Sequence, residues 1–227
     1  MTTTLITGAT RGLGKETARQ LVEAGHTVCI GARDADQGAA VAAEIGARSV
    51  QLDVRDDDSV AAAFAHVDAN GGLDVLVNNA GIAVWGQNGP EALAVFDTNA
   101  VGTIRATEAA LPLLRRSANP IVVNLSSALG SFTATHDPSK PAFTVPAVVY
   151  GASKAAVSML TVQYARVVPE VHFVAIEPGY TATEFGGMPN PHGRPVEVSA
   201  ATIAAAASAG PEGPTGVFLE DGQMLGW

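Results

Sequence analysis

The sequence contains only one cysteine, Cys29, so no disulfide bond can form within the chain. Cys29 lies inside an apolar run, where we expect it to be a small buried hydrophobic residue. There is no run of about 18 consecutive apolar residues, so we expect no membrane-spanning helix. The first residues lead directly into an apolar segment at 5–6, without the basic region and cleavage site of a secretory signal. These features favour the cytoplasm.

Basic residues are also scarce. The 13 Lys and Arg residues are outnumbered by 22 Asp and Glu residues, which leaves a net charge of -9. Because nucleic-acid binding needs a basic face, this balance argues against a nucleic-acid partner, although a few clustered arginines can still bind a phosphate ligand. The five histidines lack metal-ligand spacing, so we expect no catalytic metal.

The chain instead alternates apolar runs with helical patterns along its 227 residues. Seven segments resemble short buried strands: 3–7, 27–32, 49–52, 73–77, 121–125, 171–176 and 216–219. Helical patterns separate them at 15–25, 34–45, 57–68, 90–117, 150–167 and 198–207, and the longest is interrupted only near Pro112. Strands that alternate with helices are typical of a parallel sheet covered on both faces. We therefore predict a single α/β domain over residues 1–227, a Rossmann-type doubly wound parallel sheet of about seven strands.

The first strand leads directly into a glycine-rich segment, T-G-A-T-R-G-L-G at 7–14, which is followed by a helical pattern. Glycines allow a tight turn and a close approach of the backbone, and the N-terminus of the following helix attracts an anion. The spacing is G-x-x-x-G-x-G rather than G-x-G-x-x-G. The context predicts phosphate binding by a dinucleotide site, and the alternative is a plain turn.

The end of the second strand indicates which dinucleotide binds. A carboxylate there accepts a hydrogen bond from the ribose 2'-hydroxyl, whereas arginine suits a 2'-phosphate. Arg33 follows the strand, Arg11 projects from the glycine segment, and Asp34 is expected to cap the next helix. This arrangement favours NADP(H) over NAD, unless both arginines are simply solvated.

Polar residues stand at the ends of later strands and within one helix. Asp53 and Asn79 follow strands at the edge where such sheets bind ligands, although Asp53 could be a simple turn residue. Asn99 lies inside an apolar helical pattern. It could mark a kink or an internal water site, or be a satisfied core amide.

Tyr150 and Lys154 are four residues apart, so on a helix they lie on the same face. A free tyrosine has a pKa near ~10, and an adjacent ammonium favours its ionised form. Ser127, just after the strand at 121–125, could hold the oxygen that receives the proton. The alternative is an ordinary surface pair on an amphipathic helix.

These motifs, in this order, resemble the short-chain dehydrogenase/reductase family over essentially the whole chain. The matching pieces are T-G-A-T-R-G-L-G (7–14), L-D-V (52–54), N-N-A-G (78–81), N-A-V-G (99–102), S-x-x-G (127–130), Y-G-A-S-K (150–154) and P-G-Y-T-A-T (178–183). Within the family, the chain looks most like the NADPH-dependent carbonyl reductase type. The segments that suggest this type are G-A-R-D (31–34), G-G-L-D-V-L-V-N-N-A-G-I-A (71–83) and G-P-T-G-V-F (213–218).

The resemblance implies a role for each catalytic residue. Tyr150 would be the general acid in reduction and the base in oxidation, and Lys154 would bind the nicotinamide ribose and lower the pKa of Tyr150. Ser127 would hydrogen-bond the substrate carbonyl oxygen, and Asn99 would hold a water that passes protons to Lys154. Hydride would move from C4 of the nicotinamide to the carbonyl carbon.

The resemblance also implies a set of cofactor contacts. Within it, the backbone at Thr181 would anchor the nicotinamide carboxamide, the Thr183 hydroxyl would bind the pyrophosphate, and Asp53 and Val54 would lie near the adenine. The whole implied set is Gly8, Thr10, Arg11, Gly12, Leu13, Gly14, Arg33, Asp53, Val54, Asn79, Ala80, Gly81, Tyr150, Lys154, Pro178, Gly179, Thr181 and Thr183.

One segment departs from the family pattern. Ser127 and Tyr150 are 23 residues apart, more than in most family members. The insertion at 131–147 is Pro-rich, and we predict that it is irregular. Carbonyl-reductase-like members often carry insertions here, which can cover the site or obstruct subunit pairing. A homo-oligomer built on the Asn99 and Tyr150 helices is therefore in doubt.

The insertion and the Gly/Pro-rich loop at 184–197 are the predicted walls of the substrate pocket. Mostly apolar walls suggest a neutral, small-to-medium aldehyde or ketone. Charged loop residues such as Lys140 and Arg194, with His136 and His192, could recognise an acid but are expected to be solvated. The predicted wall residues are Trp85, Phe132, Phe143, Val145, Phe185 and Met188.

The sequence thus predicts an NADPH-dependent carbonyl reductase. One alternative is an NAD-dependent alcohol dehydrogenase, which would bind NAD more tightly than NADP. Another is a non-catalytic dinucleotide-binding sensor. The intact set of Asn99, Ser127, Tyr150 and Lys154 argues against a sensor, which has no need of all four.

Overall fold

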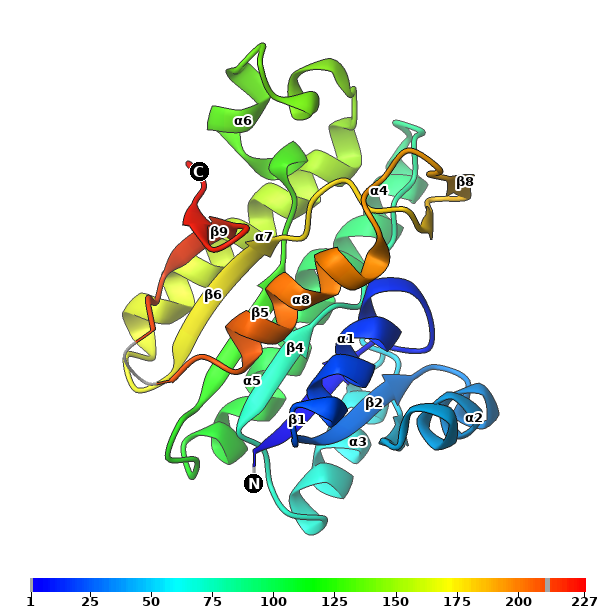
Figure 1. The fold of residues 1–227 in the computed structure, drawn as a ribbon, viewed down its shortest axis with the longest axis vertical. Coiled ribbons are helices and arrows are strands. Elements are labelled where there is room, and N and C mark those ends of the chain that lie inside the picture. The colour runs from blue at the N-terminus through cyan, green and yellow to red at the C-terminus, as the bar shows by residue number, and fades with distance from the viewer. Residues whose placement is uncertain (1, 211–212) are drawn as a thin grey trace.

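A twisted central sheet forms the middle layer of the computed structural model, which describes residues 2–210 and 213–227 (Figure 1). In this described part the sheet has eight strands in the order β10-β9-β6-β5-β4-β1-β2-β3. All neighbouring strands are parallel except β9 and β10, which are antiparallel. Their bounds are β1 Thr3–Thr7, β2 Thr27–Ala32, β3 Arg48–Gln51, β4 Val75–Asn78, β5 Ile121–Leu125, β6 His172–Glu177, β9 Val217–Glu220 and β10 Gln223–Met224.

The central strands β4 and β5 consist mostly of apolar residues, as expected for strands covered on both faces, whereas the edge strands β3 and β10 are more polar. Every residue of β4 and of β5 is buried. The strand order reverses between β1 and β4, and ligands of such sheets bind outside the carboxyl ends at this point. The parallel doubly wound fold is confirmed, and the edge strand β10 was not predicted.

Helices cover both faces of the sheet (Figure 1). On one face, apolar residues of α1, α2 and α8 pack on the strands in one cluster that contains Leu21, Ile45 and Ile203. On the other, α3, α5 and α7 form a second cluster that contains Phe64 and Leu114. The bounds are α1 Gly12–Glu23, α2 Ala35–Ile45, α8 Val196–Ala207, α3 Asp57–Ala69, α5 Gly102–Leu114 and α7 Val148–Val167.

The long helical pattern after residue 89 is irregular at Asn99, where a kink was one of the expected alternatives, and not at Pro112. Helix α4 (Gly89–Phe96) passes through a π-helical turn at Asp97–Val101 into α5. Pro112 lies inside α5, close to the end of the helix at Leu114, and does not interrupt it. The prediction of a break at Pro112 was therefore wrong, and the irregular turn surrounds Asn99 instead.

The insertion before α7 is more regular than predicted. It contains the short helix α6 (Phe132–His136) and a 3-10 turn η3 (Pro141–Thr144), and it follows a 3-10 turn η2 (Ala128–Gly130). The last residues of the chain fasten α6 in place (Figure 1). Ser131 Oγ donates to the Gly226 carbonyl at 2.6 Å, and Thr133 Oγ1 donates to the Trp227 carbonyl at 2.9 Å. The Trp227 ring stacks on Phe218 of β9 with 5.7 Å between centroids.

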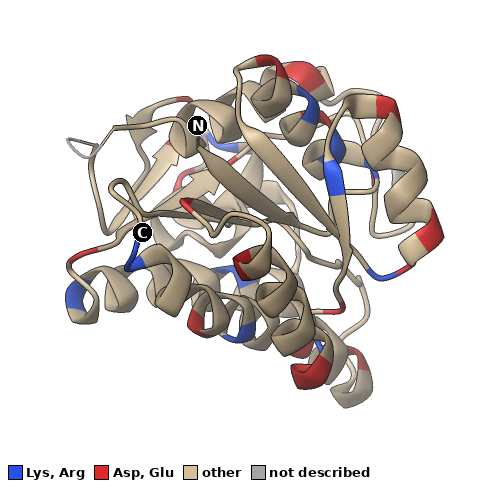
Figure 2. Cartoon of the chain, turned by 90° about the horizontal axis from the view of Figure 1, so that it is seen from below, with Lys and Arg blue, Asp and Glu red and all other residues tan. Residues whose placement is uncertain are grey.

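The loop predicted at 184–197 contains a small hairpin of β7 (Glu184–Phe185) and β8 (Met188–Pro189). Charged residues lie mostly on the helices and connecting loops, where acidic and basic segments are interspersed (Figure 2). Within residues 2–210 and 213–227, no helix combines the length and apolar character needed to cross a bilayer.

Candidate active site

A cleft of about 1460 Å³ runs across the carboxyl ends of the strands. Every residue that the sequence implied as a cofactor contact lines this cleft. So do Ser127 and, from the predicted substrate walls, Trp85, Val145 and Phe185. The fold therefore brings segments from almost the whole chain to one site.

The glycine segment fits tightly against the end of β4. Gly8 has a φ of +64°, and a Cβ there would lie 2.9 Å from the Ala80 Cα. A Cβ on Gly14 would lie 2.4 Å from Asn79 Nδ2, which donates to the Thr7 carbonyl at 2.8 Å and the Gly8 carbonyl at 3.0 Å. Asn79 thus holds the loop that places the N-terminus of α1 at the cleft, a geometry that suits a pyrophosphate.

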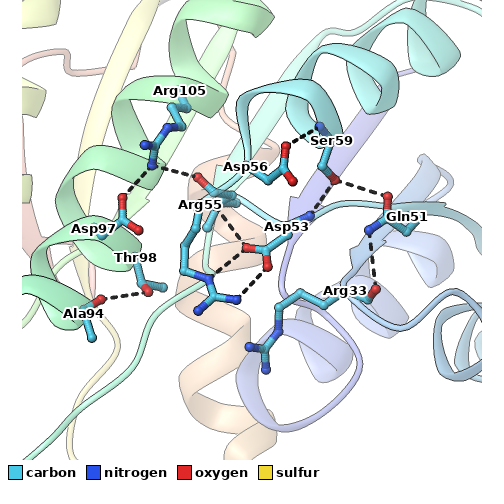
Figure 3. Close-up of polar contacts among 11 residues, drawn as sticks. Arg33, Gln51, Asp53, Arg55, Asp56, Ser59, Ala94, Asp97, Thr98 and Arg105 are labelled. Carbon is cyan, nitrogen blue, oxygen red and sulfur yellow. Dashed lines mark hydrogen bonds and ion pairs between the residues drawn. The ribbon is translucent and has the colours of Figure 1, made fainter. Parts of the chain in front are cut away.

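Arg33 and Arg55 lie near Asp53, just after the ends of β2 and β3 (Figure 3). Arg55 binds Asp53 through both its Nε (3.1 Å to Oδ1) and its Nη2 (2.7 Å to Oδ2). The pKa of Asp53 is lowered, chiefly by its hydrogen bond with Arg55 and in part by the charge of Arg33. Arg11 and Arg33 also line the cleft, and within the described part of the chain neither forms an ion pair. Arg55 was not predicted, although it is the basic residue directly after L-D-V.

Hydrogen bonds fix Asp53 relative to Arg33 (Figure 3). The backbone N–H of Asp53 donates to Ser59 Oγ at 2.9 Å, and Ser59 Oγ donates to Gln51 Oε1 at 3.1 Å. Gln51 Nε2 in turn donates to the Arg33 carbonyl at 3.4 Å. The ends of β2 and β3 are thereby held in register at this end of the cleft.

Two glycines bring the Ser127 turn against α7. Ser127 caps η2 by accepting a hydrogen bond from the Leu129 N–H at 3.2 Å. A Cβ on Gly130 would lie 2.5 Å from the Ala155 nitrogen, and a Cβ on Gly151 would lie 2.6 Å from the Leu129 carbonyl oxygen. Only small residues permit this approach, which places Ser127 beside the first turn of α7.

Tyr150 and Lys154 are both buried at this junction, with 9% and 5% of their surfaces exposed. Burial is the main cause of a raised Tyr150 pKa; the Glu177 charge raises this pKa further, and a side-chain hydrogen bond with Ser127 opposes both. Burial also lowers the pKa of Lys154 to about 8, against the opposing effect of Glu177. The Lys154 ammonium donates to the Leu125 carbonyl at 2.7 Å and lies 5.7 Å from the Tyr150 ring centroid. The surrounding protein groups therefore raise the pKa of Tyr150, whereas the family resemblance implied a lowered pKa.

Asn99 lies in the π-helical turn with 1% of its surface exposed, and both polar atoms of its side-chain amide have hydrogen-bond partners. Its Oδ1 accepts from the Ile82 N–H at 2.8 Å, and its Nδ2 donates to the Ile82 carbonyl and to Ser153 Oγ, each at 2.9 Å. A Cβ on Gly81 would lie 3.4 Å from Asn99 Oδ1 and 3.6 Å from Lys154 Nζ. Asn99 is thus a satisfied core amide close to Lys154, and its role in holding a water stays a prediction.

The substrate end differs in part from its predicted composition. Trp85 lines it and donates from Nε1 to the Gly186 carbonyl at 3.2 Å, and Phe185 packs edge-on to Tyr150. Phe132 and Phe143 were wrong predictions, because α6 and η3 turn them outward and leave them 72% and 52% exposed. The side chain of Met188 lies outside the part that the structure describes.

Several wall residues were missed, among them Ala142, Leu225, Glu177 and Glu220. Lys140 lines the cleft and pairs with Glu220 at 3.2 Å, whereas Arg194 binds Asp221 at 2.7 Å and the Pro178 carbonyl. Glu177 ends β6 and is 6% exposed. Its position directly before P-G, at the end of a buried strand, was the available signal.

Comparison with known proteins places these features in one family. A family model described as short chain dehydrogenase matches residues 2–192. The chain is 34% identical to short-chain dehydrogenase anuI of Penicillium roqueforti, over 81% of this chain and 80% of that one. It is 35% identical to serine 3-dehydrogenase of Agrobacterium fabrum, over 81% and 73%. An NADPH-bound carbonyl reductase from chicken fatty liver superposes with a TM-score of 0.87 at 26% identity, covering 99% of this chain and 98% of that one.

Proposed function

The chain belongs to the short-chain dehydrogenase family of oxidoreductases, and we propose that it reduces aldehydes or ketones with NADPH. The observation that carries this proposal is the meeting of Ser127, Tyr150 and Lys154 in the cleft that the glycine segment enters. The likeness to an NADPH-bound carbonyl reductase supports it.

The residues present fit a dinucleotide. A Cβ on Gly8 would collide with Ala80, and one on Gly14 would collide with Asn79, so only glycine lets this segment pack so closely beside the cleft. The N-terminus of α1 faces the cleft, where it can bind an anion. At the end of the cleft near β2 and β3, Arg55 neutralises the charge of Asp53. The positive charges of Arg11 and Arg33 can therefore bind an anion there. This arrangement favours the 2'-phosphate of NADP(H) over the 2'-hydroxyl of NAD.

In the proposed reaction, a bound nicotinamide supplies the hydride that reaches the carbonyl carbon. Ser127 donates a hydrogen bond to the carbonyl oxygen and orients it. Tyr150 gives its phenolic proton to the same oxygen as negative charge develops there. Lys154 would bind the ribose, and it would return a proton to Tyr150 after receiving one from solvent through the water held at Asn99.

The substrate class follows from the walls. Trp85, Phe185 and Leu225 are apolar, and the Lys140 ammonium is neutralised by Glu220. A mostly apolar, small-to-medium aldehyde or ketone suits such a pocket.

The test is turnover of a panel of aldehydes and ketones, with NADPH and with NADH, by the wild-type protein and by Tyr150→Phe. We expect Tyr150→Phe to lose at least roughly 100-fold in kcat while it keeps the NADPH affinity, because only the transferred proton is removed. Tyr180→Phe is the matched control, since this phenol also lines the cleft but is 64% exposed.

Activity that survives in Tyr150→Phe would rule out the assigned acid. NADPH binding without turnover of any compound in either direction would indicate a sensor. Tighter binding of NAD than of NADP would favour the alcohol dehydrogenase.

A further inference from the structure

Glu177 is a buried carboxylate at the catalytic centre to which the proposed mechanism gives no task. Its Oε1 accepts the Gly179 N–H at 2.6 Å, and its Oε2 accepts the Ala128 N–H. Ala128 directly follows Ser127, and Gly179 belongs to the loop that carries Thr181 and Thr183. One carboxylate therefore ties the loop of the substrate-binding serine to the loop predicted to bind the nicotinamide.

A carboxylate is energetically unfavourable at this buried position. A buried carboxylate loses its hydration, and hydrogen bonds or a cation must compensate. Among the described residues Glu177 forms no ion pair, and its two bonds come from backbone N–H groups. A bridge between two loops is a task for which both carboxylate oxygens are needed, since each accepts one N–H.

The charged groups around Glu177 come from three directions. Glu220 stands beside it on β9, in register with it, and its own cation partner is Lys140. Arg194 approaches from the segment before α8 but binds Asp221. Tyr150 and Lys154 on α7 are the titratable groups whose pKa values the Glu177 charge raises.

These neighbours affect the carboxylate in opposite directions. Burial is the largest effect and raises the pKa of Glu177, as does the Glu220 charge, whereas the two N–H donors and Arg194 lower it. The carboxylate in turn raises the pKa of Tyr150. A neutral phenol is the proton donor that reduction needs, whereas oxidation needs the phenolate.

We propose that Glu177 is a positioning residue that ties the loop of Ser127 to the nicotinamide loop and places a buried carboxylate near the proton donor Tyr150. This inference rests on the proposed function. It assigns to Glu177 an influence on the pH dependence of the reaction, through Tyr150 rather than by contact with the substrate.

Two substitutions separate the charge of Glu177 from its bridge. Glu177→Gln keeps the length of the side chain but removes the charge, and its NH2 group meets one of the two N–H donors. Glu177→Asp keeps the charge but is one methylene too short to span both loops. Glu170→Gln is the matched control, because this carboxylate lies outside the cleft, in the turn between α7 and β6, and pairs with Arg115 at 2.8 Å.

The experiment measures kcat and kcat/KM of reduction, and the pH profile of oxidation of the product alcohol with NADP. In Glu177→Gln we expect the acid limb of the oxidation profile to move down by roughly one pH unit, because a negative neighbour of the phenol is lost. In Glu177→Asp we expect this limb to stay in place while kcat of reduction falls about 10-fold or more. Glu170→Gln should match the wild-type protein in both the reduction kinetics and the oxidation pH profile.

A purely structural role would lower the melting temperature and kcat of Glu177→Gln without moving the limb, and this result would overturn the inference. Wild-type kcat in Glu177→Asp would also overturn it, even if Glu177→Gln does not fold. A wild-type protein that turns over no carbonyl compound would instead refute the proposed function, and the inference with it.

Discussion

Replacing Gly130 by alanine should separate Ser127 from Tyr150 with the smallest possible change. The new Cβ would lie 2.5 Å from the Ala155 nitrogen and 2.6 Å from the Lys154 carbonyl carbon. Both atoms belong to the backbone of α7, which cannot rotate aside as a side chain can. The η2 turn must therefore move away from the helix, and Ser127 moves with it.

Two opposing effects decide how far the Gly130→Ala substitution changes the free energy of unfolding. Overpacking of this kind costs about 1–3 kcal/mol. Gly→Ala also restricts the unfolded chain, which stabilises the folded state by about 0.4–1 kcal/mol where the backbone conformation allows it. We therefore expect a net loss of about 1–2 kcal/mol, or a melting temperature lower by about 2–8 °C for a chain of this size. A displacement of the site by about 1 Å should lower kcat/KM by up to roughly 100-fold.

Gly89→Ala is the control, because it shows how a Gly→Ala substitution changes the melting temperature when no collision occurs. Gly89 begins α4, and a Cβ there would meet nothing within 4 Å. This variant keeps the entropic gain without the collision, so its melting temperature should rise slightly and its activity should not change. Thermal unfolding and steady-state kinetics of both variants provide the measurement. If Gly130→Ala melts as high as Gly89→Ala and keeps its kcat/KM, the packing argument for this site is wrong.

Three further outcomes are expected. Arg33→Ala should weaken NADPH binding by roughly 10- to 100-fold and NADH binding far less, because one cation facing the 2'-phosphate is lost. The control is Arg48→Ala, because the Arg48 guanidinium binds the Asn70 carbonyl. Equal losses of affinity for both cofactors in Arg33→Ala would contradict the NADP assignment. Lys154 has a folded-state pKa of about 8 against an ordinary 10.5, so its destabilising effect is fully present below about pH 8 and disappears by 10.5. In urea titrations the unfolding free energy of the wild-type protein should rise over this window relative to Lys154→Met, and a constant difference would contradict the shift. Burial raises the pKa of Cys29 to about 11, so iodoacetamide at pH 8 should alkylate this thiol only after unfolding, and rapid alkylation of the native protein would show that it is accessible.

The parallel sheet could be predicted because each buried strand is an apolar run that ends at a turn. The segments 27–32 and 121–125 match β2 and β5 residue for residue. The glycine segment and the Tyr150–Lys154 pair were also readable, because their spacing alone places them on a loop and on one helix face. These features depend on local geometry.

The errors lie where distant segments decide the structure. The insertion becomes helical at α6 because Ser131 and Thr133 find hydrogen-bond acceptors at Gly226 and Trp227, nearly a hundred residues away. Phe132 is an apolar residue in the predicted wall, but the direction of α6 turns it to solvent. Glu177 reads as a turn residue until β5 and β6 are placed side by side, when it is seen to bridge two loops.

Both tryptophans of the chain lie near the substrate end, and each contacts a different segment. Trp85 is tied to the β7–β8 hairpin through Gly186, whereas Trp227 stacks on Phe218 in the tail that secures α6. The intrinsic fluorescence of the protein is therefore a reporter of this end of the cleft, and energy transfer to a reduced nicotinamide would need no label. Trp85→Phe and Trp227→Phe would divide the signal between the hairpin and the insertion, so that the response of each segment to a bound ligand can be measured separately.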